Sequence, residues 1–293
     1  MKTLSLKGCG TALITPFRNG NVDYEAYSRL VERQTSAGIH FLVPLGTTGE
    51  TPCLDENEKI RILEISKELG NGKTIIAGGG TNSLSGTVKS IKLLESHGAD
   101  AFLIVVPYYN KPTQNGLYEY FKAIAEVSDK PVVMYNVPGR TGTNMTAETA
   151  LRLAEIENIV AIKEASGNYS QISEIIRNAP EGFSVLSGND DETLSLMATG
   201  ASGVISVASN IVPELMVSLT EALLHNDMEK ARKLHHRLSP LFKNCFIESN
   251  PIPVKAGLAA MNLISNELRL PLTSASEATS VIMQNTLADL GIL

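Results

Sequence analysis

The chain has 293 residues, of which 43% are hydrophobic and 19% are charged, and its formal net charge at pH 7 is −6. This balance is typical of a globular protein with a large core, and the acidic charge argues against a nucleic-acid-binding surface. The sequence has no apolar run of the ~20 residues that a membrane span needs, and its first residues lack the apolar region of a signal peptide. Because the three cysteines, Cys9, Cys53 and Cys245, form no C-x-x-C pair, we expect a soluble cytoplasmic protein without a disulfide framework.

Eight short apolar segments that could form β-strands recur along the chain. They cover residues 10–17, 38–45, 73–78, 101–107, 131–136, 159–165, 183–186 and 203–207. Segments with helical spacing alternate with these strands, including 23–37, 55–69, 84–97, 114–128 and 147–155. Strands that alternate with helices pair in parallel, and nearly continuous apolar strands indicate burial on both faces of the sheet.

Eight such units predict an α/β fold with a closed (β/α)8 barrel, the TIM barrel. An open doubly wound sheet would need a Gly-x-Gly-x-x-Gly turn after its first strand, and residues 15–20 do not supply one. Residues 211–224 would close the barrel. The remainder reads as helices only, at 227–246, 253–261 and 274–290, with Pro251 and Pro253 between the first two of these helices. We therefore expect a catalytic barrel over residues 1–225 and an all-helical extension over residues 226–293.

Polar residues gather at the ends of the predicted strands, where the loops of a TIM barrel converge on one face. They are Thr47, Thr48 and Glu50 after the second strand, Tyr108 and Tyr109 after the fourth, Tyr135 and Arg140 at the fifth, Lys163 in the sixth and Asn189 and Asp190 after the seventh. This set has no metal-ligand spacing, and no serine or cysteine has an obvious histidine partner. The sequence therefore predicts neither a metal site nor a hydrolytic triad.

Lys163 stands in a strand that is otherwise apolar over residues 159–162. Burial of an amine disfavours its charged form, and the neutral amine can form a Schiff base with a carbonyl substrate. A lysine at a strand end can also extend to solvent, and the segment alone does not decide between the two interpretations. The accompanying tyrosines could carry protons and Arg140 could bind a carboxylate, which favours a covalent imine mechanism.

The other motifs also have structural interpretations. The glycines of residues 46–50 could serve only a tight turn, and Tyr108 and Tyr109 could be ordinary aromatic packing residues. Arg140 could be a solvated turn residue. We expect Glu50 to fix its own loop.

Several further residues are interpreted as surface or structural residues. The three glycines at 78–80 lack the Gly-Lys-Ser/Thr that would complete a phosphate-binding loop. His235 and His236 lie among basic residues of a tail helix and predict a solvated face. Lys255 and Cys53 receive the same interpretation.

Four motifs together resemble the dihydrodipicolinate synthase family, a branch of the pyruvate-dependent class I lyases and aldolases. They are Gly-Thr-Thr-Gly-Glu at 46–50, Pro-Tyr-Tyr-Asn-Lys-Pro at 107–112, Tyr-Asn-Val-Pro-Gly-Arg-Thr at 135–141 and Ile-Lys-Glu-Ala at 162–165. The resemblance spans nearly the whole chain, including residues 250–255. The Pro-Gly-Arg-Thr segment discriminates best, because N-acetylneuraminate lyase and the 2-keto-3-deoxy sugar-acid aldolases differ there.

The resemblance implies condensation of pyruvate with L-aspartate 4-semialdehyde, the first committed step toward diaminopimelate and lysine. Lys163 would form the imine with pyruvate, and no metal, nucleotide or other cofactor would be needed. Tyr135 would be the proton shuttle, linked through the Thr47 hydroxyl to Tyr109. Because that last tyrosine would reach in from a neighbouring subunit, the resemblance implies at least a dimer, and we expect a homotetramer built as a dimer of dimers.

The resemblance also implies which residues bind the substrates. Thr48 would hold the pyruvate carboxylate with its hydroxyl and its backbone amide. Arg140 would hold the carboxylate of L-aspartate 4-semialdehyde. Gly188 and Ile205 would place backbone carbonyls near the imine and the enamine.

Relatives that lysine inhibits resemble one another in an effector cleft at the subunit interface. The matching positions are Thr51, Pro52, Glu56, Lys59, Asn82, Gly86 and Tyr108. Gly86 stands where a carboxylate would hold the amine of the effector, and Lys59 would add a like charge. We therefore expect weak or absent inhibition by lysine.

Two other functions stay open on the sequence alone. One is a retro-aldol lyase of the same imine class that acts on a sialic acid or a 2-keto-3-deoxy sugar acid, and Arg140 argues against it. The other is a non-catalytic barrel that binds a keto acid. The set of Tyr135, Thr47 and Tyr109 argues against this second function, because binding alone needs no proton relay.

Overall fold

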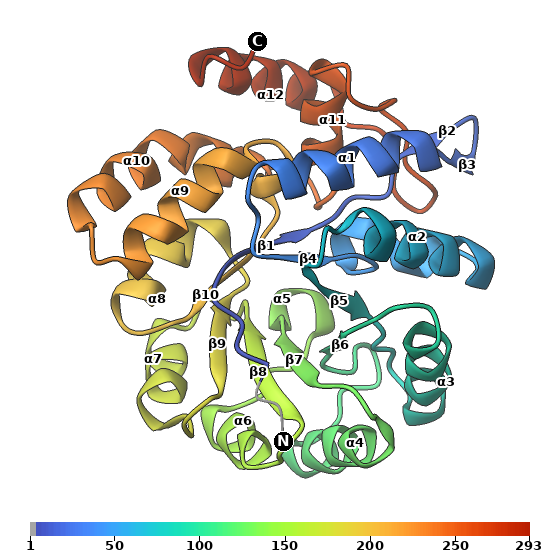
Figure 1. Cartoon of the computed structure of the whole chain (residues 1–293), viewed down its shortest axis with the longest axis vertical. Helices are drawn as coiled ribbons and strands as arrows, with labels where there is room; N and C mark the ends of the chain where they lie inside the picture. The colour runs from blue at the N-terminus through green and yellow to red at the C-terminus, as the bar shows by residue number, and fades with distance from the viewer. Residues whose placement is uncertain (1–3) are drawn as a thin grey trace.

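Eight parallel strands close into a barrel in the computed structural model, which describes residues 4–293 (Figure 1). The strands are β1 (Gly8–Ala12), β4 (Phe41–Val43), β5 (Thr74–Gly78), β6 (Ala101–Val105), β7 (Val132–Asn136), β8 (Ile159–Glu164), β9 (Ser184–Ser187) and β10 (Gly203–Ser206). Each pairs with the next one along the chain, and β10 pairs with β1 in the register Gly10 to Ile205. The predicted TIM barrel is confirmed.

Helices follow the barrel strands and form the outer layer (Figure 1). They are α1 (Tyr24–Ser36), α2 (Glu56–Leu69), α3 (Leu84–Glu95), α4 (Gln114–Val127), α6 (Ala147–Ala154), α7 (Tyr169–Asn178), α8 (Thr193–Ala198) and α9 (Pro213–Leu224). The short helix α5 (Pro138–Thr141), which follows β7, lies inside this ring (Figure 1). Several begin at a side-chain cap, such as Asp55, which accepts a hydrogen bond from the Glu58 amide while the Glu58 carboxylate accepts one from Asp55. Among residues 4–293, no helix is long and apolar enough to cross a membrane.

The core has two parts, one inside the barrel and one between the strands and the helices. The inner part includes Phe41, Leu103 and Ile205, whose side chains fill the barrel interior. Gly10 leaves room for the Phe41 ring, since a Cβ atom on Gly10 would lie 2.0 Å from that ring. The barrel is therefore packed by its own side chains below the site.

The first strand ends earlier than the sequence predicted. β1 stops at Ala12 rather than at Phe17, and a separate hairpin of β2 (Phe17–Arg18) and β3 (Asn21–Val22) follows. The segment from 13 to 16 is fully buried, so its apolar character reflects packing rather than sheet pairing. Pro16 also lacks the amide that would continue the ladder.

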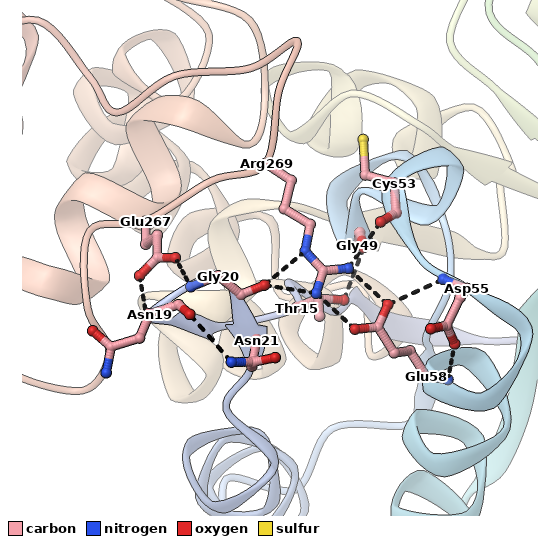
Figure 2. Close-up of polar contacts among 10 residues, drawn as sticks. All are labelled: Thr15, Asn19, Gly20, Asn21, Gly49, Cys53, Asp55, Glu58, Glu267 and Arg269. Atoms are coloured by element: carbon pink, nitrogen blue, oxygen red, sulfur yellow. Dashed lines mark hydrogen bonds and ion pairs between the residues drawn. The ribbon is translucent and has the colours of Figure 1, made fainter.

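The C-terminal extension holds α10 (Met228–Asn244), α11 (Ile252–Ala260) and α12 (Glu277–Asp289). α10 packs against α9, and α11 packs against α12 (Figure 1). The predicted helical extension is confirmed, although its last helix begins at Glu277 rather than at residue 274, and residues 262–276 form no helix. There Glu267 accepts hydrogen bonds from the amides of Asn19 and Gly20 in the hairpin, which fixes the segment without helical structure (Figure 2). The domain boundary near residue 225 stays a prediction, and buried side chains on both sides of it join one core.

Candidate active site

Lys163 lies in β8 beside Tyr135 of β7, its register partner on the neighbouring strand. The lysine is 5% exposed, and its Nζ atom lies 4.4 Å from the centre of the Tyr135 ring. This distance suits a cation–π contact and also places the phenol next to the amine. The interpretation of Lys163 as a solvent-directed lysine is therefore wrong.

A small cavity of about 50 Å³ surrounds the Lys163 amine. The expected site residues that line it are Thr47, Thr48, Tyr135, Arg140, Lys163 and Gly188. A larger adjoining cavity of about 410 Å³ shares Thr47, Tyr135 and Arg140 with it. The strand ends thus bring together one amine, one phenol, two threonine hydroxyls and one guanidinium, whereas the sequence predicted at least two phenols there.

Thr47 and Thr48 belong to η1 (Thr47–Gly49), a single 3-10 turn after β4. The amide of Gly49 donates to the carbonyl of Gly46 (3.1 Å), and the amide of Glu50 donates to that of Thr47 (3.1 Å). Glu50 ends the turn with φ of 52°, a left-handed conformation that is uncommon for a residue with a side chain. The turn needs outside support to hold that geometry.

Arg140 stands on α5, the short helix after β7, where it lines both cavities. Its Nη2 atom donates to the backbone carbonyl of Asn250 (3.2 Å) in the C-terminal extension. The Asn250 side chain donates through Nδ2 to Thr48 Oγ1 (2.9 Å), and its Oδ1 atom is buried without a partner. Sequence reasoning assigned no role to Asn250, because its contacts lie 202 and 110 residues away in the chain.

Tyr109 is not brought into the site of its own chain. It is 89% exposed and has φ of 73°, and neither cavity in the described part of the chain counts it among its lining residues. Tyr108 is 38% exposed and lines the larger cavity. The expected link from Tyr135 through Thr47 to Tyr109 is therefore not formed within a single chain.

The two residues expected to offer backbone carbonyls differ in their position. Gly188 lines the small cavity, and a Cβ atom there would lie 3.1 Å from Lys163 Cε and 2.6 Å from Ala165 Cβ. The absence of a side chain at Gly188 thus leaves space for the lysine. Ile205 is fully buried in β10, inside the barrel.

Two buried carboxyl groups lie at the same end of the barrel as the amine, in or just after β8 and β9. Burial raises the pKa of Asp190, while hydrogen bonds from Ser206 and from the amides of Ala208 and Val207 lower it, as does the positive charge of Lys163. Burial also raises the pKa of Glu164, the residue after Lys163, and hydrogen bonds led by that from Asn136 oppose the shift. The first network joins the ends of β9 and β10, and the second joins the ends of β7 and β8.

Several of the residues expected in an effector cleft lie in the larger cavity. They are Thr51, Pro52, Lys59 and Tyr108. Glu56 instead forms an exposed ion pair with Lys89 (2.6 Å), and the carbonyl of Asn82 accepts a hydrogen bond from Asn110. Gly86 follows the cap of α3, where a Cβ atom would lie 2.8 Å from both Ser83 Oγ and Thr81 Oγ1.

The solvated interpretation of Lys255 is wrong. Lys255 is 0% exposed, and its Nζ atom lies 2.6 Å from Glu50 Oε1 and 2.8 Å from the carbonyl of Thr15. Burial lowers the pKa of Lys255 to about 8, and the negative charge of Glu50 opposes the shift. Glu50 is also buried, which bears out its expected role in fixing the loop.

The prediction of a solvated face holds for His236 but not for His235. His235 is half-buried, and its ring lies 6.0 Å from that of Phe242. Cys53 is half-buried and lines the larger cavity, as do the glycines at 78–80. Across residues 4–293, no three His, Cys, Asp or Glu side chains are grouped so that they could hold a metal ion.

Comparison with known proteins gives one consistent family. The model of the dihydrodipicolinate synthetase family matches residues 5–290. A 4-hydroxy-tetrahydrodipicolinate synthase of Thermotoga neapolitana is 48% identical over 292 residues, which cover 98% of this chain and 99% of the relative.

Solved structures agree with the sequence match. The dihydrodipicolinate synthase of Thermotoga maritima superposes with a TM-score of 0.97 at 47% identity, covering 99% of this chain and all of the other. A chloride-inhibited dihydrodipicolinate synthase of Acinetobacter baumannii, solved in complex with pyruvate, superposes with a TM-score of 0.96 at 40% identity. The superposition covers 99% of this chain and 100% of that one.

Proposed function

This chain belongs to the dihydrodipicolinate synthetase family, and on that basis we propose that it condenses pyruvate with L-aspartate 4-semialdehyde to give 4-hydroxy-tetrahydrodipicolinate. The observation that carries the proposal is the buried Lys163 amine, 4.4 Å from the Tyr135 ring, in a cavity that Arg140 also lines. An amine, a phenol and a guanidinium in one small cavity match the needs of imine chemistry on two small carboxylates.

In the first step, the Lys163 amine attacks the keto carbon of pyruvate, and loss of water leaves an imine. Thr48 holds the pyruvate carboxylate through its hydroxyl and amide. The protonated imine withdraws electrons, so the methyl group of pyruvate becomes acidic and loses a proton to give the enamine. Tyr135 carries this proton, and Gly188 and Ile205 offer backbone carbonyls to the imine and the enamine.

In the second step, the enamine carbon bonds to the aldehyde carbon of L-aspartate 4-semialdehyde, whose carboxylate Arg140 binds. The amino group of the product then displaces Lys163 by transimination, which closes the ring and frees the lysine. Each of these steps uses groups of the protein and the two substrates, so the proposal includes no metal or organic cofactor. The pyruvate complex of the Acinetobacter baumannii relative supports pyruvate as the first substrate.

We place the reaction in the cytoplasm, because the three cysteines are free and suit a reducing compartment. The exposed Tyr109 supports a dimer in which this side chain completes the neighbouring site, and a tetramer would pair two such dimers. The retro-aldol and binding-only functions that the sequence left open gain no support from the family match.

Borohydride reduction in the presence of pyruvate tests the proposal. We expect mass spectrometry to find a reduced pyruvate adduct on Lys163, and we expect Lys163→Arg to lose the adduct and at least about 10³-fold in turnover. Lys233→Met is the matched control, because Lys233 pairs with Glu229 on the exposed face of α10.

Two results would contradict the proposal. A wild-type protein without an adduct would favour a binding-only barrel. An adduct together with cleavage of a sialic acid or a 2-keto-3-deoxy sugar acid, but no turnover of L-aspartate 4-semialdehyde, would favour the retro-aldol lyase.

A further inference from the structure

Lys255 lies on α11, beneath the turn that carries Thr47 and Thr48. Its ammonium group has three hydrogens and three contacts. It donates hydrogen bonds to the Glu50 carboxylate (2.6 Å) and to the carbonyl of Thr15 (2.8 Å), and its Nζ atom lies 4.3 Å from the centre of the Phe17 ring. Lysine and glutamate are both 0% exposed in their side chains. Burial of two charges costs desolvation free energy, and the contacts of this pair offset that cost.

The Glu50 carboxylate connects Lys255 to the turn that carries Thr47 and Thr48. One carboxylate oxygen binds Lys255, and the other accepts a hydrogen bond from the amide of Arg269 (3.1 Å). Glu50 directly follows η1, and its own amide closes the turn onto the carbonyl of Thr47. The hydrogen bonds to both carboxylate oxygens therefore stabilise the left-handed backbone conformation of Glu50.

Two residues next to the Lys255–Glu50 pair, Thr15 and Arg269, also stabilise the turn. The Thr15 hydroxyl donates to the carbonyl of Gly49 (2.8 Å), so Thr15 contacts both Lys255 and the turn. The Arg269 guanidinium binds the Glu58 carboxylate and the carbonyls of Gly20 and Cys53 (Figure 2). These contacts anchor the segment whose Arg269 amide donates to Glu50. Segments 205 and 219 residues away in the sequence thus converge on Glu50.

We propose that Lys255 is a positioning residue for the keto-acid subsite: its buried ammonium group holds Glu50, and Glu50 sets the conformation in which Thr47 and Thr48 face pyruvate. This inference rests on the proposed function, because it takes the turn as the binding place of the pyruvate carboxylate. The reaction then depends on the C-terminal extension even though Lys255 touches no substrate.

The experiment compares Lys255→Met, Glu50→Gln, the double variant and the wild type. Each single variant leaves one buried charge without its partner, which destabilises the fold, whereas the double variant buries no charge. We expect the single variants to lose thermal stability and the double variant to recover most of it. Lys233→Met serves again as the control, since it removes a tail lysine from an exposed ion pair.

The decisive readout is the pyruvate concentration that gives half-maximal borohydride trapping of Lys163. This value does not depend on how much enzyme is folded, so a purely structural role for Lys255 would leave it unchanged. We expect it to rise about tenfold or more in Lys255→Met and in the double variant, because small misplacements of binding groups weaken productive binding strongly. Lys233→Met should keep the wild-type value.

A stable double variant with the wild-type half-saturation would overturn the inference while leaving the proposed function intact. Failure of the double variant to fold would also contradict it, because the pair would then serve stability rather than the subsite. A wild-type protein that pyruvate and borohydride do not modify would instead refute the proposed function. The two failures are therefore distinguishable in one series of measurements.

Discussion

The surroundings of Lys163 are set by a large residue on one neighbouring strand, Tyr135, and a small one after the other, Gly188. Tyr135 on β7 covers the amine with an aromatic ring, and Gly188 after β9 leaves the space into which the lysine side chain extends. The positive charge of Lys163 lowers the pKa of the nearby Asp190 carboxyl, while burial, the largest effect, raises it.

Arg140 offers a test of how the two substrates are separated. We expect Arg140→Ala to raise the half-saturating concentration of L-aspartate 4-semialdehyde about 10- to 100-fold, the range for losing a hydrogen bond to a charged group. Arg140→Lys should recover part of this loss, because lysine keeps the charge but not the planar fork of donors. Steady-state kinetics with each substrate varied in turn measures both effects.

The matching control for Arg140 is the borohydride trapping of Lys163 with pyruvate alone. Trapping should keep nearly its wild-type dependence on pyruvate in Arg140→Ala, because the proposed mechanism assigns the first substrate to Thr48 rather than to Arg140. An equal rise for both substrates would show that Arg140 organises the whole cavity through its contact with Asn250.

At the scale of elements, α2 and α3 carry the positions on which regulation by lysine would depend. Lys59 of α2 lines the larger cavity, where its charge would repel the amines of lysine. Gly86 of α3 offers no carboxylate, and a side chain there would press on the Thr81 hydroxyl and on the Ser83 hydroxyl that caps the helix. We expect millimolar lysine to leave turnover nearly unchanged in a coupled assay, and half-inhibition below one millimolar would contradict this.

The strands and helices of the barrel were predictable because each depends on a local pattern of apolar residues. The ends of the strands were less predictable. The buried segment 13–16 looks like a continuation of β1, although its pairing with β4 ends with the hydrogen bond from the Leu13 amide to the carbonyl of Val43. The irregular segment 262–276 looks helical in part, but long-range contacts of Glu267 and Arg269 fix it instead. Patterns with short spacing carry no information about such contacts.

In the candidate site, too, the residues that depend on local patterns were predictable, and those that depend on long-range contacts were not. Thr47, Thr48, Tyr135, Arg140 and Lys163 stand at strand ends, and barrel geometry alone brings them together. Lys255 was misread as a surface residue, because its partner Glu50 is 205 residues away and no sequence pattern links the two. An Asn-Pro-Ile-Pro-Val-Lys segment among apolar residues was the available signal, since a lysine in a buried helix needs a partner.

At the scale of the whole molecule, the barrel and the extension form one functional unit. Asn250, Lys255 and Arg269 of the extension contact the turn and the arginine that the barrel contributes to the site. Buried side chains of α10, α11 and α12 also share a core with the barrel helices. A boundary near residue 225 would therefore cut through the support of the substrate subsites.

Tyr109 raises the remaining question of whether one chain is sufficient. An aromatic side chain that is 89% exposed, on a backbone with φ of 73°, is an unusual feature for a free surface.

If Tyr109 completes the site of a neighbouring copy, Lys163→Ala and Tyr109→Phe should each be poorly active alone but should complement each other when co-expressed. In a mixed dimer, one site would carry both substitutions and the other would carry neither. A statistical mixture should then recover about a quarter of the wild-type sites, measured as turnover per chain of the whole co-expressed sample. If Tyr109 acted within its own chain, every site of the mixed dimer would carry one substitution, and the mixture would show no more activity than its two components.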